Sequence, residues 1–87
     1  MVWSYRLEKK AEKDLQRLPK TIQQRVLDFL YLRADKDPFS LARALVNTQP
    51  TAHRFRAGDY RITVYLDNAA QVGHILRIQH RKDIYRP

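Results

Sequence analysis

The spacing of apolar residues changes twice along this chain, and this change limits the possible folds more than any other feature. Residues 2–7 alternate, with Trp3, Tyr5 and Leu7 on one side. Alternation with a period of two and aromatic content predicts a β-strand. We expect the three large side chains to face the core.

A helical pattern follows. Ala11, Leu15 and Leu18 are spaced four and three residues apart, which places them on one face of a helix. Pro19 disfavours helix at the residue before it and suits the first turn of a new helix. A second apolar stripe begins at Ile22. This region therefore predicts two helices joined by a tight corner.

Alternation returns in the last third of the chain. Phe55 lies between Arg54 and Arg56, and Gly58-Asp59 is a tight hairpin signal. Residues 60–66 predict a second strand, residues 67–68 a second turn, and residues 71–79 a third strand. Residues 41–49 fit either a turn of helix or an irregular connection.

Period two also predicts which side each residue of the third strand occupies. One side would carry Val72, His74, Leu76 and Ile78, and the other Gly73, Ile75 and Arg77.

The order of elements predicts an α+β fold. It consists of an N-terminal strand, a two-helix hairpin and a three-stranded antiparallel meander with a short C-terminal tail. Helices would cover one face of an antiparallel sheet, and the other face would be partly exposed. We expect the 87 residues to form one domain, 1–87, with a small core.

Charge indicates the kind of partner. Seventeen Lys and Arg against nine Asp and Glu give a net charge of +8 and a pI near 10.2. Such an excess favours nucleic acid as a partner, because each cation near a phosphate releases a condensed counterion. An acidic protein partner would satisfy the same charge. No cysteine, apolar leader or membrane-length segment is found, so we expect a cytoplasmic protein without a membrane partner. Three scattered histidines show no ligand spacing, so no metal site or cofactor is predicted.

Three segments together resemble a known family. They are AEKDLQRLP at 11–19, RFRAGDYRI at 54–62 and HRKDIY at 80–85. In this order and separation they resemble the RelE family within the RelE/ParE superfamily of toxin–antitoxin toxins, and the likeness spans nearly the whole chain.

The resemblance implies a function. RelE-like toxins are metal-independent endoribonucleases that cleave mRNA, in many members at the ribosomal A site, and so inhibit translation. It also implies a cognate RelB-like antitoxin as partner, and contact with operator DNA only through that antitoxin.

Metal-free RNA cleavage sets three chemical tasks: a base takes the 2′-hydroxyl proton, cations stabilise the phosphorane, and an acid protonates the leaving 5′ oxygen. By the resemblance, Arg61 and Arg81 hold the phosphate and Tyr85 stacks on or orients the nucleotide. An arginine fork matches phosphate oxygens, which suits the first assignment.

The proton carrier is left open by the sequence. Arg54 and Arg56 share a face and stand where some relatives carry a lysine base, but an arginine is a poor proton acceptor. His80 is a substitute as base or acid, with a structural histidine as the alternative. We therefore expect catalysis by Arg61, Arg81, Tyr85 and His80, and RNA binding by Arg54, Arg56, Arg77 and Lys82.

Two other readings stay open. A ParE-type toxin shares the fold and the first helical motif but inhibits DNA gyrase by binding and lacks the catalytic basic residues. The joint presence of Arg61, His80, Arg81 and Tyr85 favours RelE. A degenerate relative would bind only its antitoxin and operator.

Overall fold

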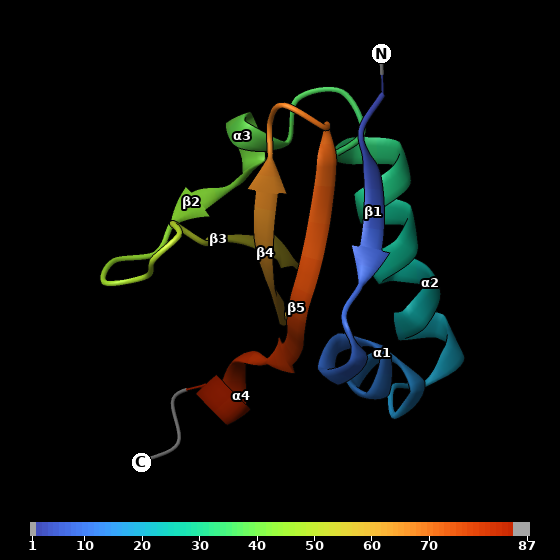
Figure 1. Ribbon diagram of the computed structural model, residues 1–87. Coiled ribbons are helices and arrows are strands. Elements are labelled where there is room, and N and C mark those ends of the chain that lie inside the picture. The colour runs from blue at the N-terminus through green and yellow to red at the C-terminus, as the bar shows by residue number, and fades with distance from the viewer. Residues whose placement is uncertain (1, 85–87) are drawn as a thin grey trace.

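The structure is a computed structural model that describes residues 2–84 (Figure 1). Its elements are β1 (Ser4–Leu7), α1 (Lys9–Gln16), α2 (Lys20–Asp28), α3 (Pro38–Leu41), β2 (Arg43–Ala44), β3 (His53–Ala57), β4 (Tyr60–Asp67), β5 (Val72–His80) and α4 (Arg81–Ile84). A π-helical turn, η1 (Phe29–Arg33), continues α2. The expected α+β fold, with its N-terminal strand, helical hairpin and β-meander, is confirmed.

The strands form one five-stranded sheet in the order β1-β5-β4-β3-β2. Strands β2 to β5 pair antiparallel, as expected. β1 instead runs parallel to β5, with Tyr5 opposite Gly73, so the expectation of a wholly antiparallel sheet was wrong at this edge. Helices rather than a hairpin turn separate β1 from the meander, and such a connection allows parallel pairing.

Residues 41–49, which the sequence left open, contain the end of α3 and the short strand β2. β2 pairs with β3 through Arg43 opposite Arg54 and Ala44 opposite His53. A strand of two residues is too short to produce an alternating pattern, which explains why the sequence did not indicate it.

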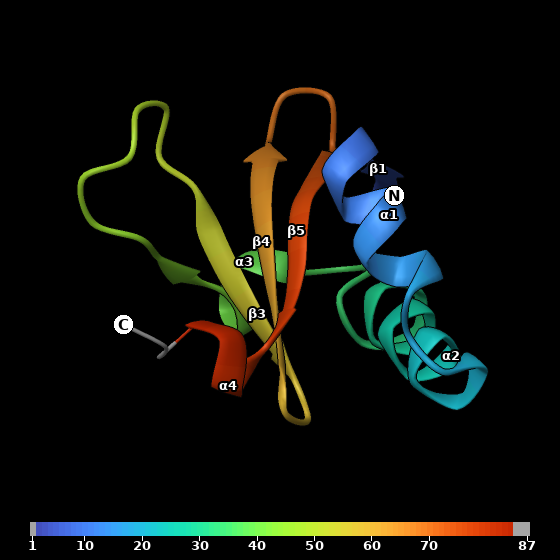
Figure 2. The ribbon, with the colours of Figure 1, turned by 90° about the horizontal axis from the view of Figure 1, so that it is seen from below.

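The core lies between the helices and one face of the sheet (Figures 1 and 2). Near the N-terminus, Trp3 and Tyr5 are buried, as their alternation predicts. The Phe29 ring of η1 packs against Phe55 of β3 with centroids 5.3 Å apart. Burial of each such side chain contributes roughly 1.5–3 kcal/mol, so apolar contact is what holds the helices to the sheet.

Tyr5 ties β1 to its neighbours. Its ring lies over Gly73 of β5, where a Cβ atom would overlap the ring. Its hydroxyl donates a hydrogen bond to the carbonyl of Ala34 at 2.5 Å. Burial, with a smaller contribution from the charge of Asp35, raises the pKa of Tyr5. Position 73 therefore requires glycine because of the ring packed on it.

A β-bulge changes the sides that residues of β5 occupy. The pairing with β4 shifts between Thr63 and Val64, and Leu76 is the extra residue on β5. As a result Ile75 and Ile78 are both buried in the core. Strict alternation placed them on opposite sides, and that prediction was wrong because a bulge leaves no mark in the hydrophobic pattern.

The carboxylate of Asp14 joins α1 to the edge of β5. Its Oδ2 atom accepts the backbone N–H of Ile78 at 2.9 Å and the Nε–H of Arg77 at 2.8 Å. Burial opposes ionisation of Asp14, but the hydrogen bonds from Arg77 and Ile78 and the charge of Arg77 outweigh it and hold the pKa of the carboxyl below its usual value. The pairing of β1 with β5 ends at Leu7 opposite Ile75, so Asp14 provides an acceptor where β1 no longer does.

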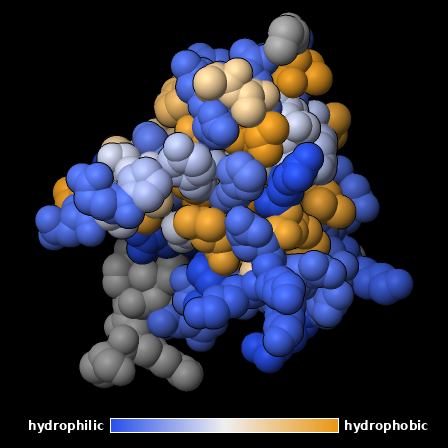
Figure 3. All heavy atoms as spheres, viewed as in Figure 1, coloured by the Kyte–Doolittle hydropathy of each residue, from blue (hydrophilic) through white to orange (hydrophobic). Residues whose placement is uncertain are grey.

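Hydrophilic residues cover the lower part of the view in Figure 3, where α1 lies in Figure 1. The exposed residues of this helix include Lys9, Lys10, Glu12 and Lys13, as its amphipathic pattern predicts. None of the helices in residues 2–84 combines the length and hydropathy that a membrane span needs.

Asp14 gives the first test. We expect Asp14→Asn to lower the free energy of unfolding by about 1–3 kcal/mol at neutral pH, because a charged hydrogen-bond acceptor is lost. Urea denaturation measures this. Glu12→Gln, which removes one charge from an exposed position of the same helix, is the matched control.

The difference should depend on pH. The pKa of Asp14 is lower in the folded protein than in the unfolded chain, so its contribution is complete above the unfolded value of roughly 3.9 and declines as the pH falls through the folded value. A stability gap between wild type and Asp14→Asn that stays constant from pH 7 to strongly acidic pH would contradict this account.

Candidate active site

Three arginines project from the face of the sheet opposite the core. On β3, the buried Phe55 has Arg54 and Arg56 as chain neighbours, and on β4 Arg61 precedes the buried Ile62. The strands pair Phe55 with Ile62 and Arg56 with Arg61. Burial of the apolar pair therefore sets the two arginines side by side on the outer face. The shared face predicted for Arg54 and Arg56 is confirmed.

A fourth arginine arrives from α4. The backbone N–H of Arg81 donates to the carbonyl of Asp59 at 2.8 Å, which fixes the start of α4 against the β3–β4 turn. The Nη1 atom of Arg81 lies 4.0 Å from Oδ1 of Asp59. Gly58, at φ 61°, provides the backbone conformation that this turn requires.

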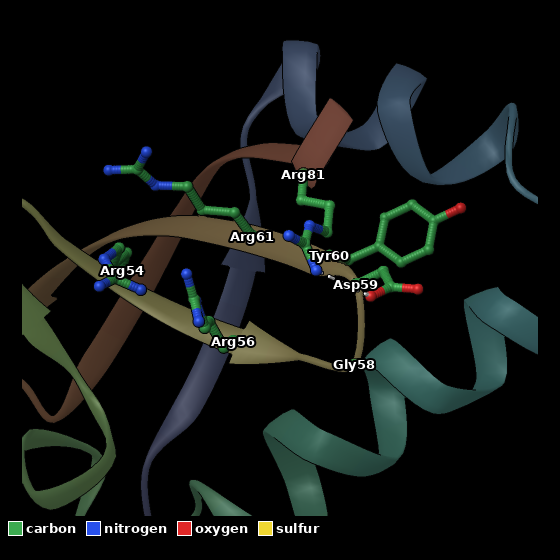
Figure 4. Close-up of a pocket in the computed structure, with 7 residues that line it drawn as sticks. All are labelled: Arg54, Arg56, Gly58, Asp59, Tyr60, Arg61 and Arg81. Carbon is green, nitrogen blue, oxygen red and sulfur yellow. Dashed lines mark ion pairs between the residues drawn. The ribbon is translucent and has the colours of Figure 1, made fainter. Parts of the chain in front are cut away.

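These side chains surround one hollow, which we call the arginine hollow (Figure 4). It is lined by Arg54, Arg56, Gly58, Asp59, Tyr60, Arg61 and Arg81. Its volume is about 310 Å³, whereas a cavity of roughly 10–15 Å³ by this kind of measure already holds one water molecule. The hollow is therefore large enough for a group such as a phosphodiester.

Within residues 2–84, Arg61 has a side-chain hydrogen-bond donor without a partner. Its Nε atom is buried and has no hydrogen-bond partner among the described residues. Leaving a buried donor unpaired costs roughly 1–3 kcal/mol, and more for a charged group. An anion bound in the hollow would bind the guanidinium groups that line it and offset the repulsion between them.

His80 and Lys82 lie at a different hollow. His80 pairs with Tyr60 across β4 and β5, and their rings meet edge to face at 5.1 Å. The Nδ1 atom of His80 accepts the backbone N–H of Lys82 at 3.1 Å. Both line what we call the α4 hollow, together with Asp14, Arg17, Leu18, Tyr60, Arg77, Ile78, Gln79 and Asp83. His80 is therefore not among the residues that line the arginine hollow.

Two other predicted site residues are also outside the arginine hollow. The guanidinium of Arg77 binds the carboxylate of Asp14, which raises the pKa of Arg77 and leaves its side chain in a structural contact. Tyr85 lies outside the described residues. Of the predicted RNA-binding and catalytic residues, the fold thus brings together Arg54, Arg56, Arg61 and Arg81.

Sequence reasoning missed Asp59 as a site residue. It had been interpreted only as part of the hairpin turn. The signal available was its position two residues before Arg61, where a turn aspartate at the end of the strand pair reaches the same face.

The chemistry of the hollow is that of anion binding. Several arginine forks around one space can hold phosphate oxygens and stabilise charge that develops on them. Within residues 2–84, no group of three or more histidine, cysteine, aspartate or glutamate side chains gathers as a metal site would require.

Comparison with known proteins identifies relatives of this chain. A family model described as "ParE toxin of type II toxin-antitoxin system, parDE" matches residues 5–85. Toxin RelG of Mycobacterium tuberculosis is 30% identical over 86 residues, covering 99% of each chain. Toxin RelE of the same organism is 33% identical over 76 residues, covering 87% of this chain and 78% of that toxin.

Solved structures of toxin–antitoxin complexes also resemble this chain in fold. The toxin–antitoxin complex RelBE2 from Mycobacterium tuberculosis matches with a TM-score of 0.85 and 26% identity, covering 93% of this chain and 100% of the matched chain. The archaeal RelE–RelB complex from Pyrococcus horikoshii OT3 matches with a TM-score of 0.75 and 28% identity, covering 93% and 97% of the two chains.

The arginine hollow predicts stabilisation by anions. Inorganic phosphate should raise Tm more than chloride at the same ionic strength, because a ligand that binds only the folded state stabilises it. A gain of about 1 kcal/mol shifts Tm by roughly 4–8 °C in a domain of this size. Differential scanning calorimetry measures the shift.

Arg61→Gln should remove most of this phosphate effect, whereas Arg6→Gln, at an exposed position of β1, should keep it. Equal phosphate effects in the two variants would show that the stabilisation comes from net charge and not from the hollow.

Proposed function

Because this chain belongs to the RelE/ParE family of toxins from type II toxin–antitoxin systems, we propose that it is a metal-independent endoribonuclease that cleaves mRNA. Cleavage of mRNA, on the ribosome as the resemblance implies, would inhibit translation. A cognate RelB-like antitoxin would neutralise the toxin and carry it to operator DNA.

The observation that supports this proposal best is the convergence of four arginines on one hollow. Arg54 and Arg56 come from β3, Arg61 from β4 and Arg81 from α4. Their guanidinium groups offer the paired N–H donors that match phosphate oxygens. A net charge of +8 adds long-range attraction for RNA.

In the proposed reaction, the 2′ oxygen of one nucleotide attacks the adjacent phosphorus. The new P–O2′ bond replaces the P–O5′ bond, which leaves a 2′,3′-cyclic phosphate and a 5′-hydroxyl end. Arg61 and Arg81 stabilise the negative charge that grows on the phosphorane oxygens. Arg54 and Arg56 hold the scissile or flanking phosphate.

The remaining predicted residues keep different roles. Lys82 lies on α4 next to Arg81 and is exposed, so we retain it as an RNA contact outside the hollow. For Arg77 we propose a structural role, because its guanidinium is bound to Asp14. Tyr85 as a base-stacking residue and His80 as proton carrier stay predictions.

The arginines give a direct test. Arg61→Ala and Arg81→Ala should each lower the cleavage rate about 10²–10³-fold, the usual cost of losing one transition-state donor. Mapping of mRNA ends after induction in cells measures this. Arg6→Ala, an exposed arginine of β1, should cleave like the wild type.

The alternative function is gyrase inhibition, which the ParE name of the family model keeps in view. Growth arrest with intact mRNA and gyrase-dependent DNA damage would decide for it and against the proposed ribonuclease.

For the antitoxin, we propose a docking place beside the arginine hollow. An apolar hollow of about 300 Å³ is lined by Arg25, Asp28, Phe29, Leu32, Arg33, Ala57 and Gly58. Leu32 is 73% exposed, and Arg33 lies over the Phe29 ring at 5.2 Å. Apolar walls with arginines at the rim fit an acidic amphipathic segment. Gly58 lines both hollows, so a bound segment would lie next to the RNA site.

Leu32→Asp tests this docking place. It should weaken binding of the cognate antitoxin by at least about tenfold while RNA cleavage persists. The reason is that a carboxylate in the wall of the hollow would lose its hydration when apolar side chains of the antitoxin pack against it. Co-expression with the antitoxin and titration calorimetry measure the loss. Val46→Asp, at an exposed apolar position outside this hollow, is the control, and an equal loss in both variants would contradict the assignment.

A further inference from the structure

Among the residues of the described range 2–84 that line the arginine hollow, few side chains can accept the 2′-hydroxyl proton. Its cations are all guanidinium groups, which stay protonated and have no lone pair to accept a proton. Tyr60 also lines it, but the ring of Tyr60 packs against the core and against His80. Among the described lining residues, Asp59 carries the only carboxylate.

His80 is poorly placed for this step. It pairs with Tyr60 and therefore lies on the side of β5 opposite to Gln79, whose partner is Arg61. Its Nδ1 atom is occupied by the backbone N–H of Lys82. The ring belongs to the α4 hollow, and reaching the phosphate held by Arg61 would require crossing the sheet edge.

Asp59 is held where substrate can reach it. Its backbone carbonyl is anchored by the N–H of Arg81 at 2.8 Å, while its carboxylate is 67% exposed. Oδ1 lies 4.0 Å from Nη1 of Arg81, too long for a strong hydrogen bond and short enough for electrostatic attraction. Figure 4 shows the carboxylate beside the Arg81 guanidinium at one end of the row of arginines.

We propose that the carboxylate of Asp59 is the general base of RNA cleavage, an inference that rests on the proposed endoribonuclease function. The carboxylate takes the 2′-hydroxyl proton as the 2′ oxygen forms its bond to phosphorus. The P–O5′ bond breaks, its electron pair stays on the 5′ oxygen, and that oxygen takes a proton from solvent. The carboxylic acid then returns its proton to solvent.

The charges around Arg81 favour this transfer. Before reaction, Arg81 faces the negative charge of Asp59. As the proton moves, that charge disappears from the carboxylate and a second negative charge grows on the phosphorane. Because the Arg81 guanidinium would lie next to both the carboxylate and the phosphorane, it can stabilise the new negative charge on the phosphorane without a large movement of its side chain.

The same geometry has a cost in binding. A carboxylate at the edge of a phosphate site repels RNA in the ground state, because like charges lie close together. Asp59 should therefore weaken RNA binding slightly while it accelerates the chemical step. This opposite effect on binding and rate separates a general base from a residue that merely supports the fold.

Asp59→Asn tests the proposal. We expect the single-turnover cleavage rate to fall about 10²–10⁴-fold, the usual contribution of a general base. The Kd for a fully 2′-O-methylated RNA, which has no nucleophile, should stay the same or decrease. Glu12→Gln, which removes a carboxylate from α1, should change neither quantity.

Chemical rescue adds a second readout. Added formate should restore part of the rate of Asp59→Gly, because a small carboxylate can occupy the exposed space left by the side chain, and chloride at equal concentration should not. A wild-type rate in Asp59→Asn would overturn the proposal, as would a rate loss matched by weaker RNA binding and without formate rescue.

Different results would contradict the endoribonuclease function and the role of Asp59 as general base. Wild-type protein that leaves RNA uncut on programmed ribosomes, and as free oligonucleotide, would remove the proposed function itself. Wild-type cleavage that survives in Asp59→Asn and is lost in His80→Ala would keep the function and assign the proton transfer to His80.

Discussion

Burial of Phe55 against Ile62 is the interaction on which the functional surface depends. Both side chains are fully buried and directly opposed across β3 and β4. Their burial contributes roughly 1.5–3 kcal/mol each, whereas two like charges about 4 Å apart in water repel by only about 1 kcal/mol. The free energy gained by burying the apolar pair therefore exceeds the repulsion between the arginines, and Arg56 and Arg61 lie together on the other face. An anion site follows directly from the packing of the core.

Two non-local contacts complete that surface. The β3–β4 turn accepts a hydrogen bond from the first residue of α4, which brings Arg81 to the arginines of the sheet. At the edge of β5 that faces away from β4, Asp14 binds Arg77 and the backbone of Ile78 and holds α1 there. Arg81 thus lies at the candidate site and Arg77 stabilises the fold, although the two are only four positions apart in the sequence.

Much of this architecture could be predicted from local pattern. The strand near the N-terminus, the helical hairpin and the three strands of the meander all appear with their expected type. The errors have specific causes. The bulge at Leu76 reversed the side of Ile78, the parallel edge at β1 depends on a partner far along the chain, and β2 is too short to show a pattern.

By itself, the sequence determined that Arg54 and Arg56 share a face, because alternation within a strand is a local property. The pairing of β3 with β4 then placed Arg61 beside them. The sequence also carried the family resemblance, which the relatives confirm. Only the tertiary structure decided that Arg77 forms a structural contact and does not line the arginine hollow, because its partner Asp14 is 63 residues away in the sequence. It likewise turned His80 toward Tyr60 and brought Asp59 beside Arg81, because these contacts depend on register, a bulge and the docking of α4.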